Sequence, residues 1–311
     1  MGHAFLEHRI FAPVLRVDRF FSDERDLEAE RSQSFVRWRN ELRLTEGSST
    51  PSYAATFSAN LRLPALNKQL RRLRIEIAGQ TREAISALLP GQTPASVDGT
   101  SGETTLRKAD AGFRFQLWET LRSHGDLGTG IIADLPPGVY GRVRVRFVEA
   151  LGRRVLARQA VTGFWRTDTR FGTTVSAELE RPLARTFLGR LSGSSTLSEV
   201  SHGAEWIGDL SFLATFRERI GAQLGVAANG ATASPVTVDR YRVYTRVRRD
   251  FYRRWIFVEL EPEYAWPWTH DHGREALWAV AVRLEFQFQG TEPPPAEPPQ
   301  PPEPADPPPL D

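Results

Sequence analysis

The feature that most constrains this chain is a strict alternation of apolar residues with polar or charged ones. In the segment RWIFVELEPEYAWPW (254–268), Glu259, Glu261 and Glu263 alternate with residues that are almost all apolar. Because successive side chains of a β-strand point to opposite faces, the glutamates share one face and the apolar residues share the other. A soluble sheet buries its apolar face and exposes its charges, whereas a membrane barrel has the reverse arrangement.

The same alternation recurs in about fourteen segments, each about nine to fourteen residues long. Segments of this length cross a bilayer at a tilt, whereas strands of soluble sandwiches are more often about five or six residues long. The sequence therefore predicts an all-β fold, a transmembrane up-and-down antiparallel β-barrel of about 14 strands. The run 127–135 has the weakest alternation, and twelve strands is the alternative. No segment approaches eighteen consecutive apolar residues, which excludes a membrane-spanning helix.

The charged face of the strands is rich in arginine and glutamate, and we expect it to line the lumen. In the hairpin around residue 250, a register with Arg249 opposite Arg254 predicts that Arg242 faces Glu261. Burying either charge series without partners would be costly, so we expect the two series to pair. The predicted lumen-lining residues are Arg142, Arg144, Arg146, Glu178, Glu180, Arg240, Arg242, Arg246, Glu259, Glu261, Glu263, Arg283 and Glu285.

Composition and connection length divide the chain into three regions. Residues 1–33 form an N-terminal segment with a short helix capped at Ser22, 34–288 form the barrel, and 289–311 form a proline-rich acidic tail. The connections alternate between a short and a long set, as periplasmic turns and extracellular loops do, and an even strand number then places both termini in the periplasm. We expect a disordered tail, either solvated or acting as a tether to the cell wall or a periplasmic partner.

Signals for enzymes, cofactors and nucleic acid are weak in this chain. It has no cysteine, a formal net charge of only +2, and no nucleophile elbow, P-loop or dinucleotide fingerprint. Histidine occurs at His202 beside Ser201 and in the loop segment THDHG (269–273), where a polar loop explains it and a rim hydrolase is the alternative. We expect no catalysis, cofactor or metal. We also expect no nucleic-acid partner, since glutamates match the arginines at 240–248.

The last predicted strand carries a resemblance to a known class. ALWAVAVRLEFQF (276–288) ends in Phe288 and resembles the C-terminal assembly signal of bacterial outer-membrane proteins. The stretch 34–288 is similar to such barrels, and the FWR…T hairpin from Phe164 to Thr174 resembles uncharacterised proteobacterial barrel proteins. The resemblance implies an outer-membrane location, contact with its lipids and insertion by the barrel assembly machinery. The chain departs from the pattern because a tail follows Phe288.

Two function classes follow from this reading. One is a pore or transport protein whose charged lumen passes small polar solutes. The other is a structural or interaction barrel whose lumen is closed by ion pairs and which recruits envelope partners through its loops or tail.

Overall fold

A computed structural model of the chain describes residues 34–62, 73–80 and 108–289, with gaps at 121, 134–135, 153, 202, 217–218, 253–254 and 271–272. The predicted helix near Ser22 lies outside the described residues, as does the predicted tail except for Gln289, which is the last residue of β15 (Leu277–Gln289). The three-region division therefore stays a prediction. Within the described part of the chain, no helix is long and apolar enough to cross a membrane.

Fifteen strands make up the described structure, and all except one are long. They are β1 (Phe35–Thr45), β2 (Ser52–Arg62), β3 (Leu73–Gln80), β4 (Lys108–Glu119), β5 (Ser123–Ala133), β6 (Gly138–Leu151), β7 (Val155–Arg166), β8 (Arg170–Ala184), β9 (Phe187–Ser198), β10 (Ala204–Phe216), β11 (Ile220–Ala231), β12 (Arg240–Asp250), β13 (Ile256–Thr269), β14 (Gly273–Arg274) and β15 (Leu277–Gln289). The two-residue β14 pairs only with the end of β13, in the loop before β15.

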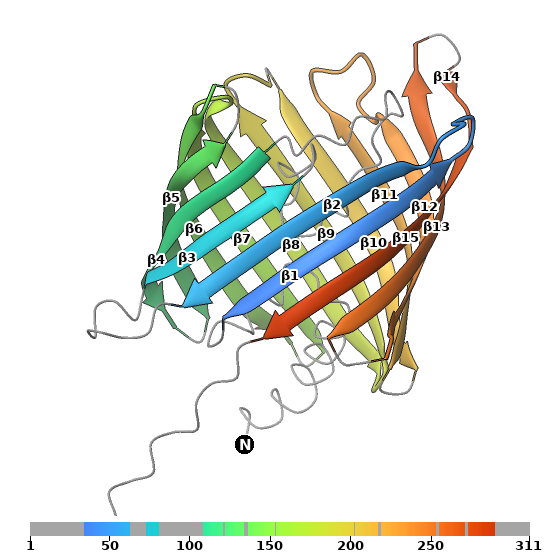
Figure 1. The fold of residues 1–311 in the computed structure, drawn as a ribbon, viewed down its shortest axis with the longest axis horizontal. Helices are drawn as coiled ribbons and strands as arrows, with labels where there is room; N and C mark the ends of the chain where they lie inside the picture. The colour runs from blue at the N-terminus through green and yellow to red at the C-terminus, as the bar shows by residue number, and fades with distance from the viewer. Residues whose placement is uncertain are drawn as a thin grey trace, which may run out of the picture.

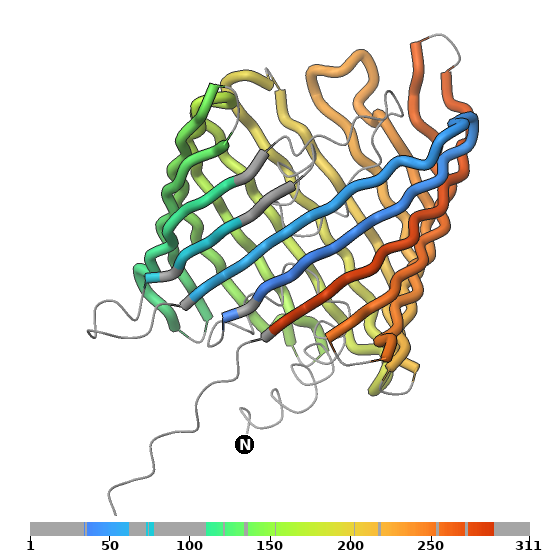
Figure 2. The backbone as a smooth tube through the Cα atoms, in the orientation of Figure 1, coloured from blue at the N-terminus to red at the C-terminus, as the bar shows by residue number. Residues whose placement is uncertain are grey.

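The other fourteen strands form one closed antiparallel wall. Each pairs with its neighbours along the chain, and the ring is completed by the pairs β12–β13, β13–β15 and β15–β1. The blue β1 and the red β15 lie side by side across the front of the barrel (Figures 1 and 2), with Phe35 opposite Gln289. The predicted up-and-down barrel of 14 strands is confirmed, and the twelve-strand alternative is wrong.

Residues 127–133 of the uncertain run belong to β5, which begins earlier than its apolar pattern indicated. The segment from Ser123 to Asp126 is also strand. Its outward residue is Gly125, which has no side chain and therefore adds no apolar residue to the alternation. The indole ring of Trp118 lies over that position, where a Cβ atom would meet it. A glycine covered by a neighbouring aromatic ring hides the alternation that identifies a strand from sequence.

The two faces of the wall have opposite polarity. Large apolar side chains such as Trp38 and Leu260 are exposed, at 47% and 45%, whereas Glu261 on the alternate face is 1% exposed. A single closed sheet has only an outside and an inside, so the buried, charged face is the inner one. Leaving this many large apolar groups in water would be unfavourable, and a hydrocarbon surrounding accounts for them.

Exposed aromatic residues form two bands on the outside of the wall. One band includes Trp278 and Tyr264, and the other includes Trp38 and Phe288. Along β15, the ten residue-to-residue steps from Trp278 to Phe288 rise about 25 Å along the barrel axis, for about 3.3 Å per step and a tilt of about 40°. This matches the spacing of the aromatic girdles that flank a bilayer core.

The connections at the two ends of the barrel differ in length. We call the end that holds Phe35 and Gln289 the short-turn end, with connections at 63–72, 120–122, 152–154, 185–186, 217–219 and 251–255. The opposite, long-loop end has connections at 46–51, 81–107, 134–137, 167–169, 199–203, 232–239 and 270–276. Both ends of the described wall lie at the short-turn end, as an even strand number requires (Figure 1).

Candidate functional site

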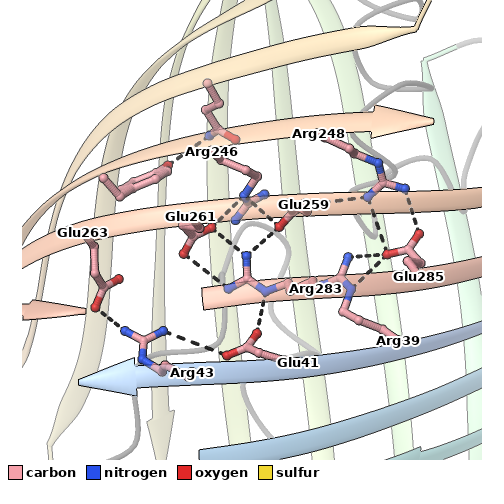
Figure 3. Close-up of polar contacts among 12 residues, drawn as sticks. Arg39, Glu41, Arg43, Arg246, Arg248, Glu259, Glu261, Glu263, Arg283 and Glu285 are labelled. Atoms are coloured by element: carbon pink, nitrogen blue, oxygen red, sulfur yellow. Dashed lines mark hydrogen bonds and ion pairs between the residues drawn. The ribbon is translucent and has the colours of Figure 1, made fainter. Parts of the chain in front are cut away.

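Charged side chains gather on the inner face of four neighbouring strands, β12, β13, β15 and β1 (Figure 3). Since every second residue of each strand points inward, the alternation brings arginines and glutamates of adjacent strands together. Each lies within 4 Å of an opposite charge in the set. We call this set the arginine–glutamate network: Arg37, Arg39, Glu41, Arg43, Arg240, Arg242, Arg246, Arg248, Glu259, Glu261, Glu263, Arg283 and Glu285.

Arg283 lies at the centre of the network and is 1% exposed. Its Nη1 lies 2.5 Å from a carboxylate oxygen of Glu259 and 2.8 Å from one of Glu261. Its Nε donates to Glu41 at 2.5 Å. The planar guanidinium has five N–H donors in a fixed fork, so one side chain joins β13, β15 and β1.

Glu285 has the complementary role of a shared acceptor. One of its oxygens accepts a hydrogen bond from Arg248 at 2.9 Å, and the other accepts from Arg39 at 2.9 Å. Arg37 adds an ion pair at 3.5 Å. These contacts extend the network from β12 across β15 to β1 (Figure 3), so the desolvation of each charge is offset by more than one partner.

The register of the β12–β13 hairpin differs from the predicted one. Arg249 lies opposite Val258 rather than Arg254. The reason is a wider turn over 251–255, which is closed by a hydrogen bond from the Phe251 N–H to the Ile256 carbonyl. The shift is by an even number of residues, so the inner and outer faces are unchanged while the facing partners change.

Several ion pairs across this hairpin are diagonal in the observed register, in which Arg242 faces Ala265 and Arg240 faces Pro267. Glu261 accepts from Arg246 at 2.8 Å, and its predicted partner Arg242 is 3.9 Å away. Arg242 is closer to Glu263, at 3.3 Å. Arg240 reaches Glu263 at 3.0 Å although the two are not directly opposite, because a long arginine side chain spans the diagonal.

A second cluster lies on the inner face of β3 to β6. Arg142 and Arg114 converge on the carboxylate of Glu76, at 2.7 and 2.6 Å. Arg146 lies 3.3 Å from Asp126, which is fully buried. The predicted residues Arg142 and Arg146 thus belong to a different sector of the wall from the arginine–glutamate network.

A third cluster lies on β7 to β9. Arg190 reaches Glu180 at 2.6 Å and Glu178 at 2.9 Å, and Arg158 lies 3.3 Å from Glu180. The remaining predicted residue, Arg144, is half-buried on the inner face of β6, opposite Asp126 and thus in the sector of the second cluster.

Several paired residues were not among the predicted lumen-lining positions, although they lie on the same inner face. The signal that identifies them is the same period-two alternation, followed into strands whose partners are distant in sequence. They are Arg37, Arg39, Glu41, Arg43, Glu76, Arg114, Asp126, Arg158, Arg190 and Arg248.

The inner face of β10 and β11 is less charged and contains a hydroxyl-centred group. The Tyr244 hydroxyl donates to Asp209 at 2.8 Å and accepts from the Gln223 amide at 2.9 Å. The guanidinium of Arg242 lies over the Tyr244 ring, 4.3 Å from its centroid. The ring itself covers Gly225 on β11, where a Cβ atom would lie 2.5 Å from it. The glycine therefore permits the close approach of the ring to the strand.

The histidine loops lie only partly within the described residues. His202, Asp271 and His272 lie outside the described residues. His270 is exposed, and its ring packs edge-on against Trp268 at 5.8 Å. Among the residues that the structure describes, no group of three histidine, aspartate, glutamate or cysteine side chains is placed to hold a metal ion.

A closed antiparallel wall, an apolar exterior with two aromatic bands and a charged interior define a class of protein. The chain is a transmembrane β-barrel of 14 strands. This conclusion rests on the wall itself and confirms the predicted fold class.

Comparisons with known proteins give distant structural matches. No family model and no curated protein sequence matches the chain. Similar solved structures include the outer membrane channel DcaP of Acinetobacter baumannii, which is 8% identical, with a TM-score of 0.44, 82% of this chain covered and 96% of that one. The CymD monoaromatic hydrocarbon channel is 6% identical (TM-score 0.49, 84% and 89% covered), and Pseudomonas putida OprB at low pH is 10% identical (TM-score 0.49, 85% and 95% covered).

Proposed function

We propose that this protein is an outer-membrane pore that passes small polar solutes through a lumen lined by arginine and glutamate. The observation that carries the proposal is the polarity of the wall, with large apolar side chains outside and ion-paired charges inside. Interior charge is expensive in a barrel filled with packed apolar side chains, and it is the normal lining of a water-filled one.

The circumference of the wall supports an open interior. Fourteen strands spaced about 4.8 Å apart and tilted by about 40° enclose a cylinder about 28 Å across between backbones. Two arginine side chains end to end do not span that distance. By this estimate, inward side chains from opposite sides of such a cylinder do not meet at its axis.

The arginine–glutamate network gives the proposed lumen a net positive charge. Its eight arginines and five glutamates leave a formal excess of three positive charges on one sector of the inner wall. A lumen with this excess attracts anions and repels cations at low ionic strength. The proposed solutes are therefore small polar molecules, with anions preferred.

The experiment is a planar-bilayer recording on refolded full-length protein. We expect stepwise conductance and, under a salt gradient, a reversal potential with the sign of an anion-preferring pore. A matched variant, Arg37→Gln with Arg240→Gln, removes two charges at the edges of the network and should shift the reversal potential towards zero. Folded protein that inserts without conducting contradicts the proposal.

The second candidate is a structural or interaction barrel, and one observation favours it. Arg248, Arg283 and Glu261 are at most 1% exposed, so these charges are occupied by one another rather than by a solute. In this case the network is a scaffold and the lumen is closed. The same recording separates the two, because a closed barrel inserts and unfolds normally yet shows no conductance.

We further propose periplasmic termini, insertion by the barrel assembly machinery, and a tail that is solvated or tethers a periplasmic partner. The placement of short turns and both wall ends at one side supports the first point. Protease added to intact cells should leave a tag after residue 311 uncut and cut one placed in 232–239. We also propose that the barrel is not an enzyme. A His270→Ala variant should then have unchanged conductance and show no change in lipid or peptide hydrolysis.

A further inference from the structure

The two ends of the barrel carry opposite charge. The connections at the short-turn end contain eleven lysines and arginines and one glutamate, which gives a formal charge of +10. The connections at the long-loop end contain ten acidic residues and three arginines, which gives −7. Each of the seven long-loop connections has a formal charge of −1, so the asymmetry is spread around the whole rim.

Described arginines place this charge at the edge of the apolar wall. Six of them at the short-turn end are exposed, and we call them the arginine collar: Arg122, Arg154, Arg181, Arg185, Arg219 and Arg249. They come from the ends of β8 and β12 and from four turns, so they are spread along the rim from β4 to β12 rather than forming one patch.

The collar lies level with the aromatic band of that end. Arg181 is opposite Gly189 on the outward face, in the register that continues to Phe212 on β10. Arg185 is two residues from Phe187, whose ring stacks on Phe212 at 6.0 Å between centroids. Aromatic bands mark the boundary between hydrocarbon and headgroups, so outward guanidinium groups here reach the headgroup layer.

We propose that the arginine collar binds the phosphates of anionic phospholipid headgroups and thereby fixes the short-turn end in the leaflet that contains them. This proposal rests on the membrane placement of the barrel and not on its being a pore. A guanidinium donates two parallel hydrogen bonds to a phosphate, and basic groups near an anionic surface each add to the attraction.

The chain also contains an acidic competitor for the collar. The tail after Gln289 carries five carboxylate side chains and no cation, and it begins at the same rim. Exposed ion pairs contribute little to binding, whereas the headgroups of a leaflet lie beside the collar continuously. We therefore expect the arginine collar to bind lipid headgroups in preference to the carboxylates of the tail.

The test uses full-length protein in nanodiscs of phosphatidylethanolamine with a quarter phosphatidylglycerol, at low and high salt. Native mass spectrometry should show phosphatidylglycerol retained on the barrel several-fold above its bulk share, falling at 1 M salt because the Debye length shrinks to about 3 Å. Replacing the six collar arginines with glutamine should abolish the enrichment, and replacing them with lysine should keep most of it. A Glu149→Gln variant, which changes the one outward carboxylate described at this level, should keep or raise it.

Three results would overturn the proposal. The first is no enrichment in the wild-type protein, and the second is enrichment that the glutamine variant retains. The third is enrichment that appears only after deletion of 290–311, which would assign the collar to the tail. Conductance recorded on the same glutamine variant keeps the pore separate, since the collar lies outside the inner wall and its loss should leave conductance unchanged.

Discussion

Replacing Glu261 with glutamine tests the inside–outside assignment of the whole wall. The change removes one negative charge that is 1% exposed and lies 2.8 Å from both Arg283 and Arg246. Removing one partner of a buried ion pair costs about 3–5 kcal/mol when the other charge is left alone. Here both arginines keep Glu259, at 2.5 and 3.3 Å, so we expect a loss of about 2–3 kcal/mol in the free energy of unfolding.

The assay is urea unfolding in detergent micelles or vesicles, followed by the mobility difference between folded and unfolded protein on a gel. The double variant Glu261→Gln with Arg246→Gln should recover about 1–2 kcal/mol of the loss, because the orphaned charge is then gone. Glu149→Gln, an exposed carboxylate at the rim, is the matched control and should change stability by about 0.5 kcal/mol or less. An increase in stability from Glu261→Gln would refute the assignment, since it would place the glutamate in hydrocarbon.

Three further predictions use the same unfolding measurement. Leu260→Arg on the outer face should destabilise the barrel by about 2–4 kcal/mol, whereas Ser194→Arg on the inner face should cost far less; equal costs would argue against two distinct faces. Gly225→Ala should destabilise by about 1–3 kcal/mol, because a methyl group displaces the tyrosine ring above it and breaks its hydrogen bonds, while Gly141→Ala has open space and should be neutral. Deleting 290–311 should leave assembly and stability intact, and failure to insert would give the tail a role in biogenesis.

The sequence predicts the strands and their faces well because both depend on one local variable, the period of the side-chain pattern. A residue two positions away shares a face whatever the partner strand is, so Glu259, Glu261 and Glu263 can be assigned together. The prediction of strands fails where an outward position has no apolar side chain of its own. At β5 the outward position is Gly125, and the apolar group that covers it is Trp118 from β4.

Pairing is harder to predict because it depends on the turn and on distant strands. The predicted register of β12 and β13 was wrong because the alternation of side chains does not determine the length of the turn at 251–255. A shift by an even number of residues keeps every side chain on the same face, so the alternation fits both registers. Glu41 and Arg283 are separated by 242 positions and meet only because the ring closes. Local patterns contain no information about which strands become the two sides of that seam.

The closing seam has a consequence for the order of events during synthesis and insertion. Arg39 and Glu285 are 246 positions apart, so the contacts that join β1 to β15 form only when the last strand has been delivered. In a chain that lacks β15, the arginines of β1 have no neighbouring strand that carries Arg283 and Glu285. Closure into a smaller ring would then bury the charges of β1 without these partners. The ion pairs across the seam therefore stabilise the closed barrel only when the chain contains all of its strands.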